Sequence, residues 1–317
     1  MESTWFFLML FGVLLVSNLA LLYKFSRRDS GETTRREFER GEQDRHTQYN
    51  ELISEVSTLL AEKVEQVKIR HELTTARAVQ EMLVPAERYT YESLSVSGKI
   101  HLPNACGGDW WYHSRVGDQV CLWIGDVTGH GVPSALVASA CRAIAGTFEH
   151  VGISDPALAM TLMNKVLYPM ITEKMCVTAI CLSVNCRSGQ AKIVNASHPS
   201  AISIKADGNI AALMEALNPP LGTVGNHEFK GSDILIRERE VLLLVTDGVL
   251  EFPKSKNPIW SLPRFMKFCA EAAGKNPQLE TLISQLERKL NSGTNFSDDI
   301  AYVAIQRVAQ TPVQMVA

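Results

Sequence analysis

The N-terminal residues form the longest uncharged run of the chain. No charged residue occurs from Ser3 to Tyr23, and aromatic side chains lie at both ends of this apolar run. At about 1.5 Å rise per residue, a helix of this length crosses the roughly 30 Å hydrocarbon core of a bilayer. Positive charges follow the run, beginning with Lys24, Arg27 and Arg28. Because basic residues favour the cytoplasmic side, we predict a single-pass anchor over residues 1–26 in the inner (cytoplasmic) membrane, with the rest of the chain in the cytoplasm.

Two other interpretations of this run are weaker. A cleaved signal peptide carries positive charge before its apolar stretch, whereas this chain begins Met-Glu-Ser-Thr. A buried core helix of a soluble protein needs neighbours to pack on, and an isolated run at a terminus has none. The pattern therefore favours an uncleaved anchor.

A charged segment and then an amphipathic pattern follow the predicted anchor. Residues 27–50 are rich in both charges and have no continuous apolar stripe, which is typical of a solvated helix or a flexible linker. From Leu52 onward, apolar residues recur at steps of three and four: Ile53, Val56, Leu60, Val64 and Val67. This spacing predicts an amphipathic helix to about residue 84, which Pro85 ends. Its narrow seam is typical of a short coiled coil, so residues 52–84 either join two copies of the chain or pack on the chain's own folded domain.

The pattern becomes mixed over residues 85–308. Short β-type runs, several separated by turn dipeptides, occur at residues 93–100, 119–126, 177–184, 191–195, 201–204, 241–247 and 298–305. Helical patterns occur at residues 134–151, 156–168, 262–273 and 277–291, the second with Ser154 or Asp155 as its N-cap. Because strands and helices are grouped rather than strictly alternating, we predict an α+β domain. Residues 309–317 are predicted to be a disordered tail.

Composition excludes some classes of protein. The net charge of −3 gives no basic excess with which to neutralise phosphates, so nucleic-acid binding is not expected. The seven cysteines are odd in number and lack the paired spacing of a zinc site. We interpret them as reduced residues of the core.

Acidic residues stand at the ends of apolar runs. Asp109 lies in GlyGlyAspTrpTrp, Asp126 and Asp247 each end a strand-like run, and Asp298 and Asp299 precede the last one. Burying a carboxylate at such a place is costly unless it is paired or binds a metal ion. No lysine or arginine accompanies these positions, and carboxylate oxygens suit hard ions such as Mg²⁺ or Mn²⁺. The pattern therefore predicts a metal site.

Six short motifs and their order along the chain resemble those of a known protein family. GlyGlyAspTrpTrp, GlyAspValThrGlyHisGlyValProSerAla, AsnAlaSerHisPro, ProProLeuGly, ThrAspGlyValLeuGlu and SerAspAspIleAla follow one another between residues 78 and 306. This series resembles that of the SpoIIE-type branch of the PPM (protein phosphatase 2C-like) serine/threonine phosphatases. That branch contains the phosphatases that act on regulators of sigma factors. The resemblance implies an α–β–β–α sandwich, in which two antiparallel sheets are flanked by helices.

The resemblance also implies two metal ions, Mn²⁺ or Mg²⁺, and their ligands. Asp126 would bridge both ions. The other ligands would be Asp109 and the backbone carbonyl of Val127 for one ion, and Asp247 and Asp298 for the other. A water between the ions would attack phosphorus directly, so no nucleophilic side chain is required.

Three further residues have open roles. Asp298 is preferred to Asp299 because the family's ligand is the first residue of that motif, and Asp299 stays the alternative. His130, between two glycines, either assists the leaving group as an acid or holds its turn by a hydrogen bond. His198, in AsnAlaSerHisPro, is expected to be structural.

The resemblance finally implies a function. The chain would hydrolyse phosphoserine or phosphothreonine on a partner protein, and small anti-anti-sigma-type regulators are the leading analogy for that substrate. The main alternative is a catalytically inactive module that binds phosphoproteins at the membrane, which a lost ligand would indicate, yet all four ligand positions are aspartate. A membrane scaffold whose functional part is the amphipathic helix is a third possibility.

Overall fold

The computed structural model describes residues 9, 11–19, 32–103, 106–129, 131–171, 175–213, 218–251, 261–291 and 298–308. The chain divides into two compact units, residues 1–69 and residues 70–317. Residues 11–19 are helical, and α2 (Glu32–Leu83) is one continuous helix. Residues 32–50 are therefore helix rather than flexible linker. The helix ends two residues before Pro85, as the sequence predicts.

The membrane anchor and the pairing of two copies stay predictions. No helix within the described ranges is both long and apolar enough to cross a membrane. Much of the predicted anchor, residues 1–8, 10 and 20–26, lies outside those ranges, as does the predicted tail at residues 309–317. The seam residues of α2 from Ile53 to Val67 are exposed in the single chain.

The second unit is built on two antiparallel sheets in its described part. Sheet A has the order β1-β2-β11-β10-β7-β8, and sheet B has the order β3-β4-β5-β6-β9. The strands of sheet A are β1 (Arg88–Tyr91), β2 (Leu94–His101), β7 (Ile202–Ile204), β8 (Ile210–Ala212), β10 (Val241–Val245) and β11 (Ile300–Arg307). Those of sheet B are β3 (Trp110–Val116), β4 (Gln119–Val127), β5 (Val177–Asn185), β6 (Gln190–Ala196) and β9 (Ser232–Leu235). The helices of this unit are α3 (Val132–Val151), α4 (Pro156–Leu167), α5 (Asp247–Leu250), α6 (Leu262–Ala273) and α7 (Leu279–Asn291).

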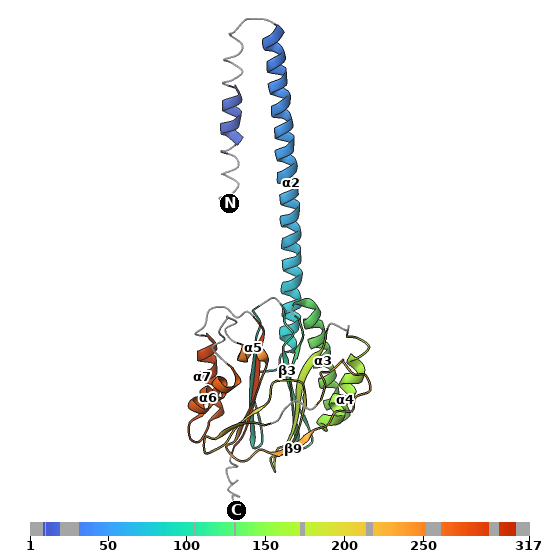
Figure 1. Cartoon of the computed structure of the whole chain (residues 1–317), viewed down its shortest axis with the longest axis vertical. Helices are drawn as coiled ribbons and strands as arrows, with labels where there is room; N and C mark the ends of the chain where they lie inside the picture. The colour runs from blue at the N-terminus through green and yellow to red at the C-terminus, as the bar shows by residue number, and fades with distance from the viewer. Residues whose placement is uncertain are drawn as a thin grey trace, which may run out of the picture. The chain divides into compact units, whose positions relative to one another are not determined.

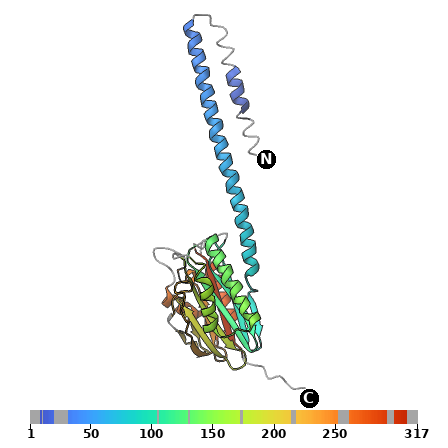
Figure 2. The same cartoon turned by 90° about the vertical axis from the view of Figure 1, so that its right-hand side faces the viewer.

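Both faces of the central strands are buried, and this layering confirms the predicted sandwich. Successive side chains of a strand point to opposite faces. In β10, Leu242 and Leu244 belong to the core between the sheets, whereas Val241 and Leu243 pack toward α6 and α7. Helices α3 and α4 cover the outer face of sheet B, with Trp123 of β4 beneath them. Figure 1 shows α6 and α7 on one side of the sheets and α3 and α4 on the other, and Figure 2 turns the α3–α4 layer toward the viewer.

Helix ends follow local chemistry. The Asp155 side chain accepts a hydrogen bond from the Ala157 N–H at 2.9 Å, so Asp155 rather than Ser154 is the N-cap of α4. Helix α3 ends at Gly152, which adopts the left-handed conformation (φ 76°) that glycine reaches without strain. These caps fix where the layer over sheet B begins and ends.

The sequence prediction missed the short strands β1, β8 and β9, and it also missed the longer strand β3. Its residues, TrpTrpTyrHisSerArgVal, show no alternation of apolar and polar side chains because both of its faces are covered. Trp111 lies between the sheets, and Trp110 and Tyr112 lie in the layer with α3. The run at residues 241–247 was also predicted too long, because Asp247 begins α5.

Most of the cysteines lie in the core, as the sequence predicts. All seven are free, and six of them are buried. Cys176, which precedes β5, is partly exposed.

Candidate active site

The predicted acidic residues meet at one edge of the sandwich. Asp109 directly precedes β3, and Asp126 lies near the end of β4, which pairs with β3. Asp247 lies just beyond β10, and Asp298 and Asp299 directly precede β11, which pairs with β10. Both sheets thus contribute strand ends to this set of five residues, which we call the aspartate edge.

Hydrogen bonds fix two of the carboxylates across the sheets. Asp109 is only 2% exposed, and its Oδ2 accepts a hydrogen bond from Thr246 Oγ1 at 2.7 Å. Asp299 is also buried, and its Oδ2 accepts a hydrogen bond from the Gly108 N–H at 2.8 Å. Asp298 in turn accepts a hydrogen bond from the Asp299 N–H at 3.0 Å. The loop that enters β3 is therefore held by the ends of β10 and β11.

The aspartate edge concentrates negative charge. Burial raises the pKa of Asp109 well above its usual value, and the charges of Asp126, Asp299 and Asp247 raise it further. Burial also raises the pKa of Asp126 to about 7, with added repulsion from Asp247, Asp298 and Asp299 and an opposing hydrogen bond with Asp109. Each charged group responsible for these shifts is another carboxylate. Such a cluster is favourable only when it is protonated or neutralised by a cation.

Glycine at position 108 allows the backbone to approach this edge closely. The Val127 N–H donates a hydrogen bond to the Gly108 carbonyl at 3.3 Å. A Cβ atom on Gly108 would lie 2.6 Å from the Val127 carbonyl oxygen and 3.4 Å from Asp126 Oδ1. The Val127 carbonyl and the Asp126 carboxylate therefore lie side by side, and only glycine leaves room for them.

The donor groups suit a hard divalent cation. As they stand, no three His, Cys, Asp or Glu side chains within the described ranges converge closely enough to enclose an ion. The predicted ligands are nevertheless all oxygen donors, and the neighbouring carboxylates raise the pKa of Asp109 and of Asp126. Oxygen donors of this kind bind Mg²⁺ or Mn²⁺ rather than Zn²⁺. The residues therefore fit the predicted metal ions.

One of the two histidines can be placed. His130 lies outside the described residues. His198 is buried behind Asp126: its Nδ1 lies 2.8 Å from the hydroxyl of Thr178, which pairs with Asp126 across β4 and β5. Burial lowers the pKa of His198 to about 3, so this side chain is neutral and supports the strand ends rather than exchanging protons.

A glutamine near the end of α2 also reaches the site. Gln80 is buried; its Nε2 donates a hydrogen bond to the Gly107 carbonyl at 2.7 Å, and its Oε1 accepts one from the Gly107 N–H at 3.2 Å. Gly107 adjoins Gly108 and Asp109, so Gln80 holds the loop that carries the first aspartate. The sequence prediction missed Gln80 because nothing in a mostly exposed helix distinguishes one glutamine from the next.

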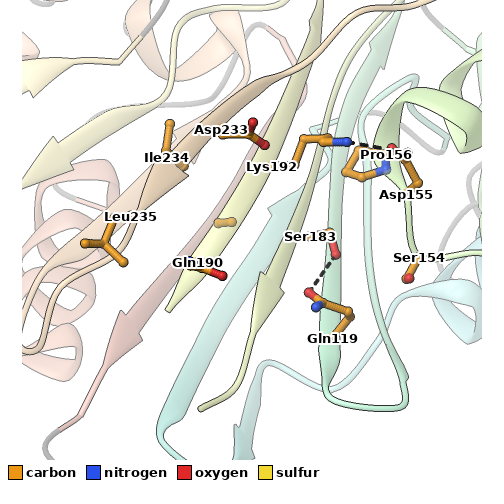
Figure 3. A pocket seen from close by; sticks show the side chains of 11 residues that line it. Gln119, Ser154, Asp155, Pro156, Ser183, Gln190, Lys192, Asp233, Ile234 and Leu235 are labelled. Atoms are coloured by element: carbon orange, nitrogen blue, oxygen red, sulfur yellow. Dashed lines mark hydrogen bonds and ion pairs between the residues drawn. The ribbon is translucent and has the colours of Figure 1, made fainter. Parts of the chain in front are cut away.

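A separate hollow of about 740 Å³ lies at the other end of sheet B. Figure 3 shows its lining, in which Lys192 Nζ lies 3.5 Å from Asp155 Oδ2 and Ser183 donates a hydrogen bond to Gln119 at 3.2 Å. Gln119 begins β4 and Asp126 lies near its end. At about 3.4 Å per residue along a strand, the two lie on the order of 25 Å apart. The hollow is therefore not part of the aspartate edge.

The fold is that of a PP2C-type phosphatase domain. The family model described as Stage II sporulation protein E (SpoIIE) matches residues 116–308, more than half of the chain, and the chain belongs to this family. The predicted membership in the SpoIIE-type PPM phosphatases, in the sigma-factor-regulator branch, is thereby confirmed.

Two curated relatives from Bacillus subtilis are similar over the same part. The chain is 24% identical over 207 residues to the phosphoserine phosphatase RsbU, covering 65% of this chain and 61% of RsbU. It is 26% identical over 191 residues to the phosphoserine phosphatase RsbP, covering 59% of this chain and 47% of RsbP. The chain thus spans about half the length of the curated relatives that it matches.

Solved structures share the fold. A Mycobacterium tuberculosis structure of RsbU and RsbW domains has a TM-score of 0.60 at 25% identity, covering 69% of this chain and 61% of that chain. The SiaA-PP2C domain of Pseudomonas aeruginosa has a TM-score of 0.62 at 21% identity, covering 76% of this chain and 98% of that domain. RsbX, solved in complex with magnesium, has a TM-score of 0.53 at 15% identity, covering 69% of this chain and 98% of RsbX.

Proposed function

We propose that this protein is a metal-dependent serine/threonine phosphatase that removes phosphate from a phosphorylated regulatory protein. The observation that carries the proposal is the aspartate edge, where burial and carboxylates from both sheets raise the pKa of Asp109 and Asp126. Perturbed carboxylates gathered at one edge of a fold are typical of a functional site. The names of the similar proteins RsbU and RsbP, both phosphoserine phosphatases, support the same reaction.

The chain's own residues would bind and orient the reacting groups. Bound at the aspartate edge, two Mn²⁺ or Mg²⁺ ions would supply a water of lowered pKa and neutralise the charge of the phosphate. Asp109, Asp126, Asp247, Asp298 and the Val127 carbonyl would hold these ions, all through oxygen atoms. The hydroxyl of Thr246 keeps the carboxylate of Asp109 oriented.

The two adjacent aspartates take different parts in this proposal. The carboxylate of Asp299 is buried and accepts the Gly108 N–H hydrogen bond, which joins the ends of the two sheets, so we assign it to holding the β3 loop. Asp298, which is partly exposed, is then the ligand. Replacing each in turn with asparagine and measuring the affinity for Mn²⁺ distinguishes them, because only the ligand's loss should weaken binding strongly.

The proposed substrate is a phosphoserine on a small regulatory protein of the anti-anti-sigma type. This part rests on the resemblance to the sigma-factor-regulator branch and on the names of the relatives. Fold alone does not identify a substrate, so the partner has to be found by assay of phosphorylated candidates.

The test of the reaction uses p-nitrophenyl phosphate and the full chain. We expect hydrolysis with Mn²⁺ or Mg²⁺, none with a chelator, and a strong loss in Asp126→Asn and Asp247→Asn. Equal rates in the wild type and both variants would refute the metal mechanism. Absence of hydrolysis together with binding of a phosphoprotein would instead favour the inactive binding module.

We further propose that α2 regulates the site and joins two copies of the chain through residues 52–84. The exposed seam residues and the two hydrogen bonds between Gln80 and Gly107 support this proposal. Val56→Glu with Leu60→Glu should change both the oligomeric state and the phosphatase rate, whereas Thr58→Glu with Gln66→Glu, which adds the same charge outside the seam, should change neither. Unchanged mass in solution and unchanged rate in the seam variant would contradict the proposal.

The last part of the proposal concerns location. The uncharged run from Ser3 to Tyr23 and the basic residues after it support a single-pass anchor in the inner membrane, with the phosphatase domain in the cytoplasm. We expect the full chain to sediment with membranes and to resist extraction with high salt. A chain that lacks residues 1–26 should stay in the supernatant, and equal distribution of the two would contradict the anchor.

A further inference from the structure

Large apolar side chains are exposed on α3 directly after the aspartate edge. Helix α3 begins five residues beyond Val127 and turns Ser134 toward the edge, where the Ser134 Cβ would lie 3.3 Å from a Cβ on Gly108. Val132 and Leu136 lie four residues apart, on one face of the helix. Both are exposed, Leu136 to 66%. This flank of the edge therefore presents apolar surface to solvent.

A second exposed apolar group lies after α4. Tyr168 and Met170 follow the helix, and Val224 belongs to the loop beside them; all three are exposed, Met170 to 62%. Asn164 of α4 holds that loop, because its Nδ2 donates a hydrogen bond to the Val224 carbonyl at 2.8 Å and its Oδ1 accepts one from the Gly222 N–H at 2.8 Å. These three side chains are thus presented on a firmly held backbone.

Backbone pairing connects this second group to the aspartate edge. Leu221, three residues before Val224, exchanges two backbone hydrogen bonds with Val177, at 3.1 and 2.8 Å. Val177 pairs in turn with Val127, which adjoins Asp126. Neighbouring strands lie about 4.8 Å apart, so the Leu221 backbone is on the order of 10 Å from Val127. Both apolar groups therefore flank the same strand ends.

We propose that these five side chains, the rim (Val132, Leu136, Tyr168, Met170 and Val224), form the docking surface for a folded phosphoprotein with apolar side chains next to its phosphoserine. The inference rests on the proposed phosphatase function. A folded protein that brings a phosphoserine to Asp126 has to cover the surface around these strand ends, which both parts of the rim flank. Other apolar residues of α3 and α4, such as Val151 and Leu158, are also exposed, so what distinguishes the rim is its position beside the strand ends that carry the aspartates. Exposed apolar side chains beside a reactive site are typical of an interaction surface.

The rim also explains how the site selects a protein. The aspartate edge acts on phosphate, which all phosphoesters share, so it cannot distinguish one partner from another. Apolar contacts next to the site add binding energy only for a partner whose surface fits them, and truncating central contacts of such an interface typically costs about 2 kcal/mol or more. The rim should therefore affect folded substrates and leave small esters untouched.

The test uses three full-length proteins. They are the wild type, a rim variant that combines Leu136→Ser and Met170→Ser, and the control variant Leu235→Ser. Leu235 is a matched control because it is 46% exposed and lines the hollow of Figure 3, at the other end of sheet B. The probes are p-nitrophenyl phosphate, a phosphorylated anti-anti-sigma-type protein, and a short phosphoserine peptide copied from that protein. Rates and the Kd of the folded phosphoprotein are measured for all three proteins.

The rim variant should lose on the order of 30-fold or more in kcat/KM and in affinity for the folded phosphoprotein, since about 2 kcal/mol corresponds to that factor. Its rate on p-nitrophenyl phosphate and on the peptide should stay within twofold of the wild type, and the control should match the wild type throughout. Unchanged Kd and kcat/KM for the folded protein, or an equal loss on all three probes, would overturn the inference. A wild type that binds the phosphoprotein but hydrolyses none of the probes overturns the proposed function instead, and the Kd comparison still tests the rim.

Discussion

Two clusters of partly or fully buried ionisable groups in the phosphatase domain are built in opposite ways. At the aspartate edge, carboxylates face other carboxylates, and the pKa of Asp126 rises to about 7. On the outer side of sheet A, Glu287 of α7 instead meets Lys99 Nζ at 3.1 Å and His101 Nε2 at 2.8 Å, and it accepts a hydrogen bond from the Tyr302 hydroxyl. Burial raises the pKa of Glu287, but the hydrogen bonds from His101 and Tyr302 outweigh it and lower the pKa to about 2.

The difference separates a structural role from a functional one. The charge of Glu287 is satisfied by groups of the chain itself, so it contributes to the folded state without any ligand. At Asp109 and Asp126, burial and the neighbouring carboxylates raise the pKa, so a cation or protons would stabilise these two side chains. The site whose carboxylates have a raised pKa is therefore the one to which we assign chemistry.

The largest effect should follow from replacing a carboxylate of the aspartate edge. Asp126→Asn should lower the rate on p-nitrophenyl phosphate by at least about 100-fold, because loss of a ligand costs more than loss of a residue that only orients a ligand. Its free energy of unfolding without metal should not fall, because the substitution removes a repelling charge. Urea unfolding beside the rate assay measures both quantities.

Gly108→Ala tests whether the phosphatase rate depends on the close backbone packing at the aspartate edge. The added Cβ would lie 2.6 Å from the Val127 carbonyl oxygen, so the loop or the strand end has to move. A misplacement of about 1 Å at a reacting centre can cost up to about 100-fold in rate. Gly41→Ala is the control, because no atom lies within 4 Å of its added Cβ, and it should keep the wild-type rate.

Glu287→Gln should have the opposite effects to Asp126→Asn: the phosphatase rate should be kept, and the stability should fall. The rate should stay near that of the wild type, since Glu287 lies on α7, away from the ligands. The free energy of unfolding at pH 7 should fall by about 1–3 kcal/mol, because charged hydrogen-bonding partners are left poorly satisfied. A variant that loses activity but not stability would break the distinction between the two clusters.

The smallest expected effect is the pH dependence of the difference in free energy of unfolding between the wild type and Glu287→Gln. The folded-state pKa of Glu287 is lowered from 4.5 to about 2, so the unfolded chain binds this proton first as the pH falls. The stabilisation is therefore complete above about pH 4.5 and is lost as the pH falls toward 2. Urea unfolding of the wild type and Glu287→Gln across this range should show the two curves converging in acid, and a gap that stays constant would contradict the assignment.

The sequence predicted the fold because its two main signals are local. Apolar strand-like runs and helical periodicity are read within windows of about ten residues, and they located the central strands and the helices α3, α4, α6 and α7. Asp126 and Asp247 were recognisable for a similar reason, since each stands at a strand end beside a glycine-bearing turn, whereas Asp109 and Asp298 were identified mainly from the family resemblance. The described structure brings these positions to one edge, as the motif order implies.

The features that the sequence did not reveal depend on contacts between distant segments. Strand β3 lacks alternation because helix α3 covers one face and the opposite sheet covers the other. The hydrogen bonds of Gln80 with Gly107 join residues 27 positions apart, and that of Gly108 with Asp299 joins residues 191 positions apart. A pattern read over about ten neighbouring residues cannot detect contacts between residues so far apart in the chain.

A calorimetric titration of the full chain with Mn²⁺ at pH 7, repeated in two buffers of different ionisation enthalpy, tests the central claim most directly. Ligand carboxylates must be deprotonated to bind a cation, and the pKa of Asp126 in the metal-free chain is raised to about 7. The wild type should therefore bind Mn²⁺ and release protons, whereas Asp126→Asn should bind far more weakly and Glu287→Gln should behave as the wild type does. Binding of equal strength in Asp126→Asn, or no binding in the wild type, would contradict the account.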